Sequence, residues 1–324
     1  MSAFQTIAGI EVLELPTNWP VGPVNLFLVR GEKLTLVDCG RKLPVAWRMF
    51  VDFLKTHDLT PRDIEQIVLT HHHDDHVGLL DYLLAERDIP IYAHANSLPY
   101  LTNDQAHYKR SEAFFYSLYK QFGIEDNVSH KLSKRTVPRL NIQHKIMLAK
   151  ELDEGVAIPG LPDWQVLETK GHAQSHISLY RPNDRILLCG DHLIKHVPAG
   201  IFQESPITPA TERSKPLLQY IDNLHKLAKL PVSVALSGHG EPIDHVHEHI
   251  WQVLRKIEKR IRKVADTLKE GPKTGLEIVQ DLYKHRYQSQ LELFTSDTLG
   301  LLDLLIHQAK ITAETRDGVI YYKL

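Results

Sequence analysis

The chain of 324 residues lacks several features that would assign it to a specialised class. It has only two cysteines, Cys39 and Cys189, which excludes the disulfide framework of a small secreted domain. No apolar run approaches the length of a membrane span, and the first residues lack the basic and apolar regions of a signal peptide. We therefore expect a cytoplasmic protein with no membrane partner.

Charge of one sign is not in excess either. Lys and Arg number 38 against 40 Asp and Glu, which gives a formal net charge of -2 and argues against a general affinity for nucleic acid. The hydrophobic content of 43% is that of an ordinary globular protein, and the length suits one large domain with a small one.

Histidine, by contrast, is abundant: the chain has 20, and four of them lie in one short stretch between residues 70 and 78. His71 and His73 are two residues apart and project to the same side of an extended backbone, while Asp75 and His76 follow closely enough to face a second ion. Imidazole and carboxylate are the ligands of zinc, iron and manganese. The stretch predicts two adjacent cation sites, with a chance grouping in a histidine-rich chain as the alternative.

Short apolar runs separated by turns predict strands, and apolar residues at helical spacing predict helices. The expected strands cover residues 10–15, 24–29, 34–37, 65–70, 89–93, 164–169, 176–180, 185–189 and 232–236. One helix is expected to begin at Pro44, a second to cover residues 77–86 and a third to cover residues 217–227. Strands and helices thus alternate, and the histidine stretch follows the end of a strand, where functional loops gather.

Two segments depart from this alternation. Residues 98–145 combine a helical pattern over 108–122 with a basic, polar stretch, and we interpret them as a lid or insertion. From Trp251 a long helix carries many basic residues, Thr274 and Glu277 form a capping box for a second helix, and residues 298–308 form a third. A hairpin around Asp317 and Gly318 follows. Three helices and a hairpin suggest a small winged-helix-like domain.

Three later strands also end at residues that can bind metal: His172, Asp191 and His239. Together with the histidine stretch they resemble the metallo-β-lactamase superfamily, whose motifs are a His-x-His-x-Asp-His turn, a distant Gly-His, a Gly-Asp and a final Gly-His. Within it the chain is most similar to the glyoxalase II-like branch and to lactamase-beta-2-like proteins. The resemblance implies an α/β, αββα sandwich over residues 1–248, with residues 98–145 as the lid and a winged-helix-like domain over 249–324.

The resemblance also implies a division of the ligands between two divalent metal ions, zinc or alternatively iron or manganese. One ion would be held by three histidines, the other by Asp75 and two histidines, with Asp191 bridging them. Asp75 would in addition orient a metal-bridging hydroxide, which makes it the expected catalytic residue. The expected metal ligands are His71, His73, Asp75, His76, His172, Asp191 and His239.

Three further residues have two open interpretations each. His176 and Asp38 either support the metal ligands from behind or pack in the core. His196 either touches the substrate or donates a proton to the leaving group, or it is a surface histidine.

The resulting hypothesis is a metallohydrolase with a binuclear site that cleaves an ester, thioester or lactone. The substrate would be a small molecule, and the basic lid would favour an anionic one. A phosphodiesterase or endoribonuclease that binds RNA through basic residues is the alternative. A third hypothesis is a metal-sensing DNA-binding protein, but residues 298–308 are rich in leucine and nearly devoid of Lys and Arg, which argues against groove binding. We expect the C-terminal domain to cover the substrate pocket or to form a homodimer interface.

Overall fold

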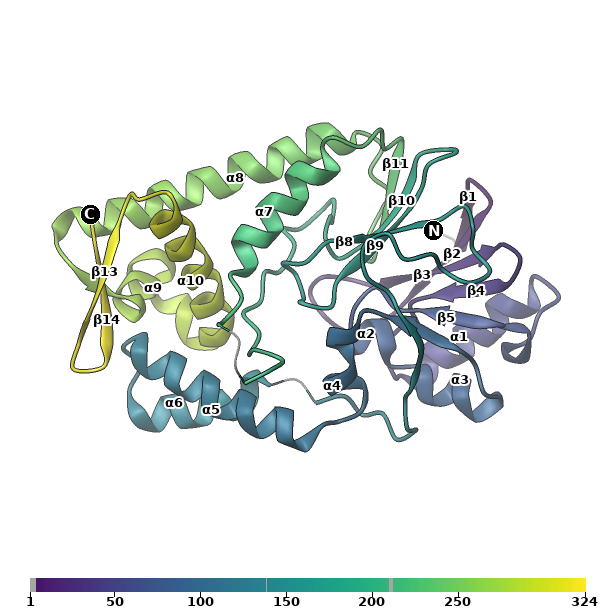
Figure 1. Cartoon of the computed structure of the whole chain (residues 1–324), viewed down its shortest axis with the longest axis horizontal. Coiled ribbons are helices and arrows are strands. Elements are labelled where there is room, and N and C mark those ends of the chain that lie inside the picture. The colour runs from purple at the N-terminus through teal and green to yellow at the C-terminus, as the bar shows by residue number, and fades with distance from the viewer. Residues whose placement is uncertain (1–3, 138, 210–211) are drawn as a thin grey trace. The chain divides into compact units, whose positions relative to one another are not determined.

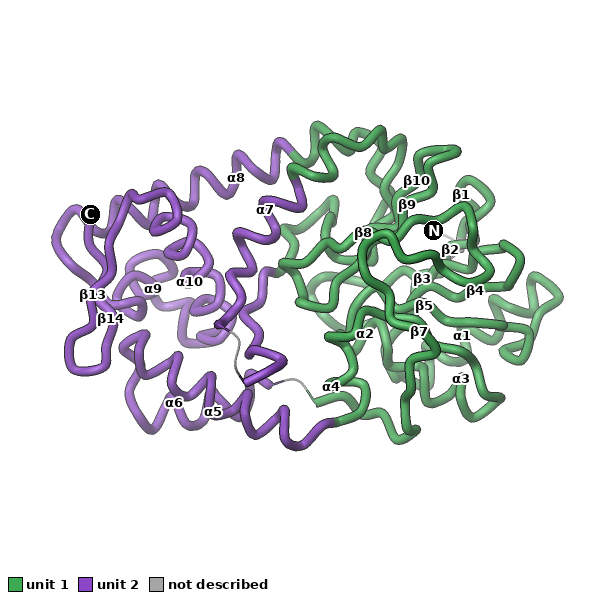
Figure 2. Tube along the Cα trace, in the orientation of Figure 1, with its two compact units in different colours: residues 1–103, 139–200, 225–250 green, residues 104–138, 201–224, 251–324 purple. Residues whose placement is uncertain are grey.

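The structure, a computed structural model, describes residues 4–137, 139–209 and 212–324. The chain divides into two compact units, coloured green and purple in Figure 2. Unit 1 comprises residues 1–103, 139–200 and 225–250, and unit 2 comprises residues 104–138, 201–224 and 251–324. The segment predicted as a lid, residues 98–145, therefore contributes to both units, and the domain boundary after residue 248 stays a prediction.

Unit 1 contains a sheet of seven strands, whose order in the sheet follows their order in the chain. The first four strands pair antiparallel and the last four, which share β4, pair parallel. The strands are β1 (Phe4–Ile7), β2 (Ile10–Leu15), β3 (Val24–Arg30), β4 (Leu34–Val37), β5 (Gln66–Val68), β6 (Ile91–Ala93) and β7 (Leu148–Glu151).

A second sheet in unit 1 has four strands in the order β11-β10-β9-β8. Strands β9 and β10 form the hairpin expected from the sequence, with Leu187 opposite Tyr180, while β10 and β11 run parallel. These strands are β8 (Gln165–Glu168), β9 (Ile177–Arg181), β10 (Ile186–Gly190) and β11 (Val234–Ser237).

The two sheets of unit 1 pack against each other through an apolar core. Phe27 and Val29 of β3 lie in this core with Leu179 of β9 and Leu188 of β10. The intervening residues of β3 are also buried, because helices cover the other face of the larger sheet (Figure 1). The helices described for this part of the chain are α1 (Pro44–Lys55), α2 (Asp74–Val77), α3 (Leu80–Glu86) and α4 (Leu98–Leu101), with 3-10 helices η1 (Pro61–Asp63) and η2 (Ala95–Ser97).

The helix expected over residues 77–86 is wrong as a continuous element, because α2 ends at Val77 and α3 begins at Leu80. Gly78 lies between them, where a Cβ atom would come within 2.3 Å of the backbone nitrogen of Lys42. The absence of a side chain lets the loop before α1 pass directly over the histidine stretch. The break therefore fixes the place of that stretch beside the start of α1.

Unit 2 is mostly helical, with a sheet of three strands in the order β12-β14-β13. Its strands are β12 (Lys273–Thr274), β13 (Thr312–Arg316) and β14 (Val319–Lys323), and its helices include α5 (Gln105–Gln121), α6 (Asp126–Thr136), α9 (Gly275–Tyr283) and α10 (Leu291–His307), with 3-10 helices η3 (Leu268–Glu270) and η4 (Lys284–Ser289). Helices α7 (Pro216–Leu227) and α8 (Val246–Thr267) have residues in both units.

The predicted capping box of α9 is confirmed, since Thr274 Oγ1 accepts from Glu277 N and Glu277 Oε2 accepts from Thr274 N. The predicted C-terminal hairpin is confirmed as β13 and β14, but helix α10 begins at Leu291, earlier than expected. The winged-helix-like assignment of this segment stays a prediction. None of the helices in the described part of the chain is both long enough and apolar enough to cross a membrane.

Candidate metal centre

The ligand-type residues found in the sequence meet at one edge of unit 1. Strands β4 and β5 are parallel, and so are β10 and β11, so that the carboxyl ends within each pair lie together. The segments that follow β5, β8, β10 and β11, including helix α2 after β5, carry the seven residues proposed as metal ligands, and Asp38 follows β4 directly. The topology thus brings together side chains from positions 71 to 239.

Three histidines form the first group. The ligand nitrogens of His71, His73 and His172 all lie within 4.8 Å of one another. Nδ1 of His73 is 3.1 Å from Nε2 of His71 and 2.9 Å from Nε2 of His172. Burial lowers the pKa of all three imidazoles, that of His73 to about 3. They are therefore neutral at physiological pH, with converging nitrogen atoms.

Asp75, His76 and His239 form the second group, again with ligand atoms within 4.8 Å of one another. Nε2 of His239 lies 3.2 Å from Oδ2 of Asp75, and Nε2 of His76 lies 3.9 Å from Oδ1 of the same carboxylate. All three side chains are buried. Unlike the first group, this one contains a negative charge.

Asp191 lies between the two groups. Its Oδ2 atom is 3.5 Å from Nε2 of His172 in the first group and 3.4 Å from Nε2 of His239 in the second. Its Oδ1 atom is 3.4 Å from Nε2 of His76. One carboxylate can therefore reach ions held by either group.

The acidic side chains dominate the electrostatics of the second group. Burial by itself lowers the pKa of His76, but the charges of Asp191 and Asp38 outweigh it and raise that pKa well above its usual value. Burial is likewise outweighed at His239, whose pKa Asp191 and Asp75 raise to about 9. Burial raises the pKa of Asp191, yet the neighbouring His76 and His239 hold it well below the usual range. The buried carboxylates thus attract positive charge, which a metal ion can supply in place of protons.

Three buried polar atoms of the centre provide a test of whether it fits metal ions. Nε2 of His76, Oδ1 of Asp191 and Nε2 of His239 make no hydrogen bond to any described residue. Buried polar atoms without a partner are costly and uncommon, and each of these points into the cluster. A cation bound there would satisfy all three, so the residues present fit divalent metal ions.

Asp38 supports the second group from behind. Its carboxylate accepts hydrogen bonds from the backbone and hydroxyl of Thr70, both at 2.8 Å, and from Nδ1 of His76 at 2.8 Å. In the neutral ring, the proton on Nδ1 leaves Nε2 of His76 with a lone pair that faces the cluster. Of the two interpretations left open by the sequence, the geometry favours support of a ligand over simple packing.

Backbone carbonyls play the same part for two other histidines. Nδ1 of His172 donates to the carbonyl of Gly200 at 2.6 Å, and Nδ1 of His239 donates to the carbonyl of Pro23 at 2.8 Å. In its neutral form, each ring therefore presents an unprotonated Nε2 to the centre.

His176 lies behind Asp191. Its Nε2 accepts a hydrogen bond from the backbone nitrogen of Asp191 at 3.0 Å, so its Nδ1 carries the proton and donates to Thr169 Oγ1 at 2.8 Å. Gly190, just before Asp191, has a φ of +45°, and a Cβ atom on it would come within 2.7 Å of His176 Nε2. The geometry again favours support over packing alone.

His196, by contrast, is exposed and belongs to neither group. Its Nε2 donates to the carbonyl of Val21 at 2.8 Å, and its ring lies against Gly240, where a Cβ atom would be 2.5 Å from Nδ1. This histidine joins the loop before β3 to the loop after β11.

Sequence reasoning missed three residues that shape the centre. Thr70 binds Asp38, and Asn25 binds the loop that carries His239. A Cβ atom on Gly238 would approach Asp191 Oδ1 to 2.3 Å, so only glycine allows this close contact. Gly238 precedes a ligand in the sequence and offered a signal, whereas Asn25 lies far from any motif and offered none.

Comparison with known proteins agrees with this geometry. The model of the metallo-beta-lactamase superfamily matches residues 19–239. The chain is 34% identical over 318 residues to the probable metallo-hydrolase YqjP of Bacillus subtilis (strain 168), with 98% of each protein covered. It is 26% identical over 200 residues to a hydroxyacylglutathione hydrolase of Idiomarina loihiensis, covering 62% of this chain and 53% of that protein.

Among solved structures, a metallo-beta-lactamase family protein from Thermus thermophilus superposes with a TM-score of 0.76 at 25% identity. That superposition covers 98% of this chain and 99% of the other. The predicted α/β fold is thereby confirmed, and the glyoxalase II-like branch receives only weak support from the distant hydroxyacylglutathione hydrolase. The chain belongs to the metallo-beta-lactamase superfamily.

Proposed function

We propose that this protein is a metal-dependent hydrolase that holds two divalent ions and cleaves an ester, thioester or lactone. The observation that carries the proposal is the convergence of two buried ligand groups that share Asp191, with three inward-facing polar atoms that lack a partner among the described residues. The similarity to a probable metallo-hydrolase over 98% of the chain supports the reaction class, and the hydroxyacylglutathione hydrolase supports a small acyl substrate.

The division of ligands follows the two groups. We assign His71, His73 and His172 to one ion, assign the second group to the other, and place Asp191 between the two. Zinc suits this set of imidazoles and carboxylates, as do iron and manganese. Bound divalent ions would lower the pKa of a water molecule toward neutrality and polarise the carbonyl group of the substrate.

Asp75 is the residue that we assign to orient the attacking water. Burial raises the pKa of this carboxyl group, but the neighbouring His76 and His239 lower it below its ordinary value. Asp75 is therefore ionised at neutral pH and acts as a hydrogen-bond acceptor. No side-chain nucleophile is needed, since a water molecule activated by the bound ions would attack the substrate.

The test is a combined metal and substrate survey of the purified protein. We expect two equivalents of metal by elemental analysis, and hydrolysis of a carboxylic ester, thioester or lactone that a chelator abolishes and added metal restores. The panel should include β-lactams, phosphodiesters and an RNA oligomer. Turnover of RNA that exceeds every carboxylic substrate, or a protein that takes up no metal, would overturn the proposal.

A matched pair of histidine variants sharpens this test. His73→Ala removes a ligand from the first group and should lose metal and activity together. His94→Asn changes a buried histidine outside both groups and should lose neither. Equal metal content in the two variants would contradict the ligand assignment.

A further inference from the structure

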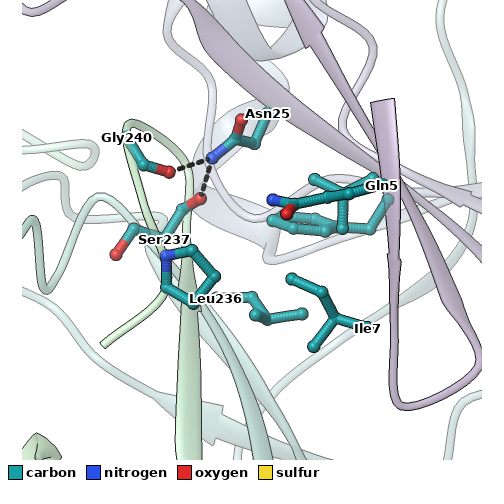
Figure 3. Close-up of a pocket in the computed structure, with 9 residues that line it drawn as sticks. Gln5, Ile7, Asn25, Leu236, Ser237 and Gly240 are labelled. Atoms are coloured by element: carbon teal, nitrogen blue, oxygen red, sulfur yellow. Dashed lines mark hydrogen bonds between the residues drawn. The ribbon is translucent and has the colours of Figure 1, made fainter. Parts of the chain in front are cut away.

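Asn25, near the start of β3, contacts the loop that carries His239. Only 4% of Asn25 is exposed, and its Nδ2 donates to the carbonyls of Ser237 at 2.9 Å and Gly240 at 2.8 Å. Figure 3 shows both hydrogen bonds as dashed lines from the same amide nitrogen. The two carbonyls bracket Gly238 and His239, so that one side chain fixes both ends of this short loop.

The backbone beside Asn25 binds the same loop. Its nitrogen donates to the carbonyl of Gly238 at 2.7 Å, and Val24 forms an isolated bridge with His239. The carbonyl of Pro23 accepts the hydrogen bond from Nδ1 of His239. Residues 23–25 thus contact the loop at each of its four positions, from 237 to 240.

The loop is in turn joined to the bridging ligand. Gly238 N donates to the carbonyl of Gly190 at 2.7 Å, and Gly190 directly precedes Asp191. Since β3 belongs to the larger sheet, whereas β10 and β11 belong to the smaller one, Asn25 ties the two sheets together at the metal centre. A shift of the loop would move His239 and disturb the close contact between Gly238 and Asp191.

Of the two polar atoms of the Asn25 amide, only Nδ2 makes hydrogen bonds to described residues. Its Oδ1 atom is buried without a hydrogen-bond partner among the described residues. Asn25 also lines a pocket together with apolar side chains such as Ile7 and Leu236 (Figure 3). An unsatisfied buried oxygen is unfavourable, so an apolar residue of similar shape would suit this environment if packing alone mattered. Asn25 supplies two donated hydrogen bonds that no apolar side chain can supply.

We propose that Asn25 is a positioning residue, which orients the 237–240 loop so that His239 completes the second ligand group. The assignment rests on the proposed function, because it presumes that this group binds a metal ion. Asn25 does not itself contact that ion. Its loss should weaken one metal equivalent more than the other, since the first group draws no ligand from this loop.

The experiment compares two neutral substitutions of buried amides. Asn25→Leu keeps the shape of the side chain and removes the donor. Gln66→Met does the same at the start of β5, the end away from the histidine stretch. Gln66 is fully buried, and its Nε2 donates to Thr35 Oγ1 and to the Pro159 carbonyl. Its Oε1 has no partner among the described residues. The control therefore matches the buried environment, the number of donated bonds and the unpaired oxygen.

Zinc is the probe, and its affinity is measured by competition with a chromogenic chelator, with the melting temperature measured in parallel. We expect Asn25→Leu to weaken binding of one zinc equivalent by about 10- to 100-fold, the range for residues that orient metal ligands, and to leave the other within about 3-fold of the parent protein. Gln66→Met should lower the melting temperature to a similar extent and bind both equivalents normally. Asn25→Ala gives the same comparison should the leucine prevent folding.

Two outcomes would overturn the assignment, and they are distinguishable. If the unsubstituted protein binds fewer than two zinc equivalents, the proposed function itself fails, and the positioning role fails with it. If the unsubstituted protein binds two and Asn25→Leu or Asn25→Ala binds both as Gln66→Met does, the proposed function stands and Asn25 has only a structural role.

Discussion

Unit 1 contains a second cluster of ligand-type side chains, and its comparison with the metal centre is instructive. His94, Asp153 and Glu168 also place ligand atoms within 4.8 Å of one another. However, the side chain of Asp153 is 57% exposed and that of Glu168 is 28% exposed, against 4% for Asp75 and 8% for Asp191. Water screens and solvates the outer cluster, whereas the carboxylates of the centre are buried, where their charges are screened less.

The histidine tautomers differ as well. The backbone nitrogen of Asn96 donates to Nδ1 of His94 at 3.0 Å, so the proton of this imidazole is on Nε2, the atom that faces the two carboxylates. In the candidate metal centre the Nδ1 atoms of His76, His172 and His239 face oxygen acceptors, so that Nε2 of each neutral ring faces the cluster without a proton. Both clusters contain histidine and carboxylate side chains. They differ in the hydrogen-bond partner of the histidine Nδ1 atom, which is a donor for His94 and an acceptor for His76, His172 and His239.

The largest effect should come from Asp191, which reaches both ligand groups. Asp191→Ala should reduce metal content by more than one equivalent and bring hydrolysis down to background. The reason is that it removes the carboxylate that reaches both groups, and with it the negative charge that would balance a bound ion. Elemental analysis and steady-state kinetics measure both. Asp153→Ala, in the outer cluster, is the control and should keep full metal content. Retained metal in Asp191→Ala would remove the distinction between the clusters.

A smaller effect is expected from Asp38, which holds His76 from the side away from the other candidate ligands. Asp38→Asn preserves size and tolerates the positive φ of +60° at this position, but an amide does not stabilise the imidazole as a carboxylate does. We expect metal affinity or activity to fall by about 10- to 100-fold. A chelator titration against the parent protein checks this. An unchanged affinity would show that the tautomer of His76 is set by something other than Asp38.

Metal removal should make stability depend on pH. The pKa of His239 is about 9 in the folded metal-free protein, against an ordinary value of 6.5. Protonation of this group therefore stabilises the fold fully below about pH 6.5, and that contribution is lost as the pH rises through about 9. A bound metal ion takes the place of the proton.

The melting temperatures of metal-loaded and metal-free protein should consequently diverge by several degrees as the pH rises from about 6.5 through about 9, the metal-free form being the less stable. Thermal unfolding with and without chelator, at matched ionic strength, measures this difference. A separation that stays constant across the range would contradict the electrostatic account of the second ligand group.

The smallest effect should come from His94→Asn in the outer cluster. Asparagine can accept the hydrogen bond from Asn96 N, as His94 does at the start of η2, so the local turn should persist. Metal content and turnover should stay within about 2-fold of the parent, while the free energy of unfolding falls by about 1 kcal/mol. Denaturant unfolding and elemental analysis test the two parts separately. A lost metal equivalent would make the outer cluster a metal site after all.

Much of unit 1 could be predicted from local patterns. The bounds predicted for strands β2, β3 and β4 agree with the structure almost to the residue, because the short apolar runs between turn residues are unambiguous there. Helix α6 was not predicted, since only Ser129, Leu132 and Ser133 are buried in it and the apolar periodicity is weak. Strands β1 and β7 were missed for a related reason: each is an edge strand of its sheet, and the residues of β7 are mostly exposed.

For the candidate site, the sequence by itself determined which side chains were available. Ligand-type residues that directly follow apolar strands must appear at a strand end, because the strand period and the turn after it leave them no other place. That reasoning predicts the set of candidate ligands, and the resemblance to the superfamily divides them into two groups with Asp191 between them.

Only the tertiary structure decided how those side chains are held. Asn25 and Ser237 lie 212 positions apart in the chain, and a hydrogen bond between them depends on how two sheets pack, which no local pattern encodes. The same holds for the Pro23 carbonyl under His239 and for the tautomer that separates His94 from the histidines of the centre. The orientation of a ligand depends on its partners in space, so the sequence could name the ligands but not the residues that orient them.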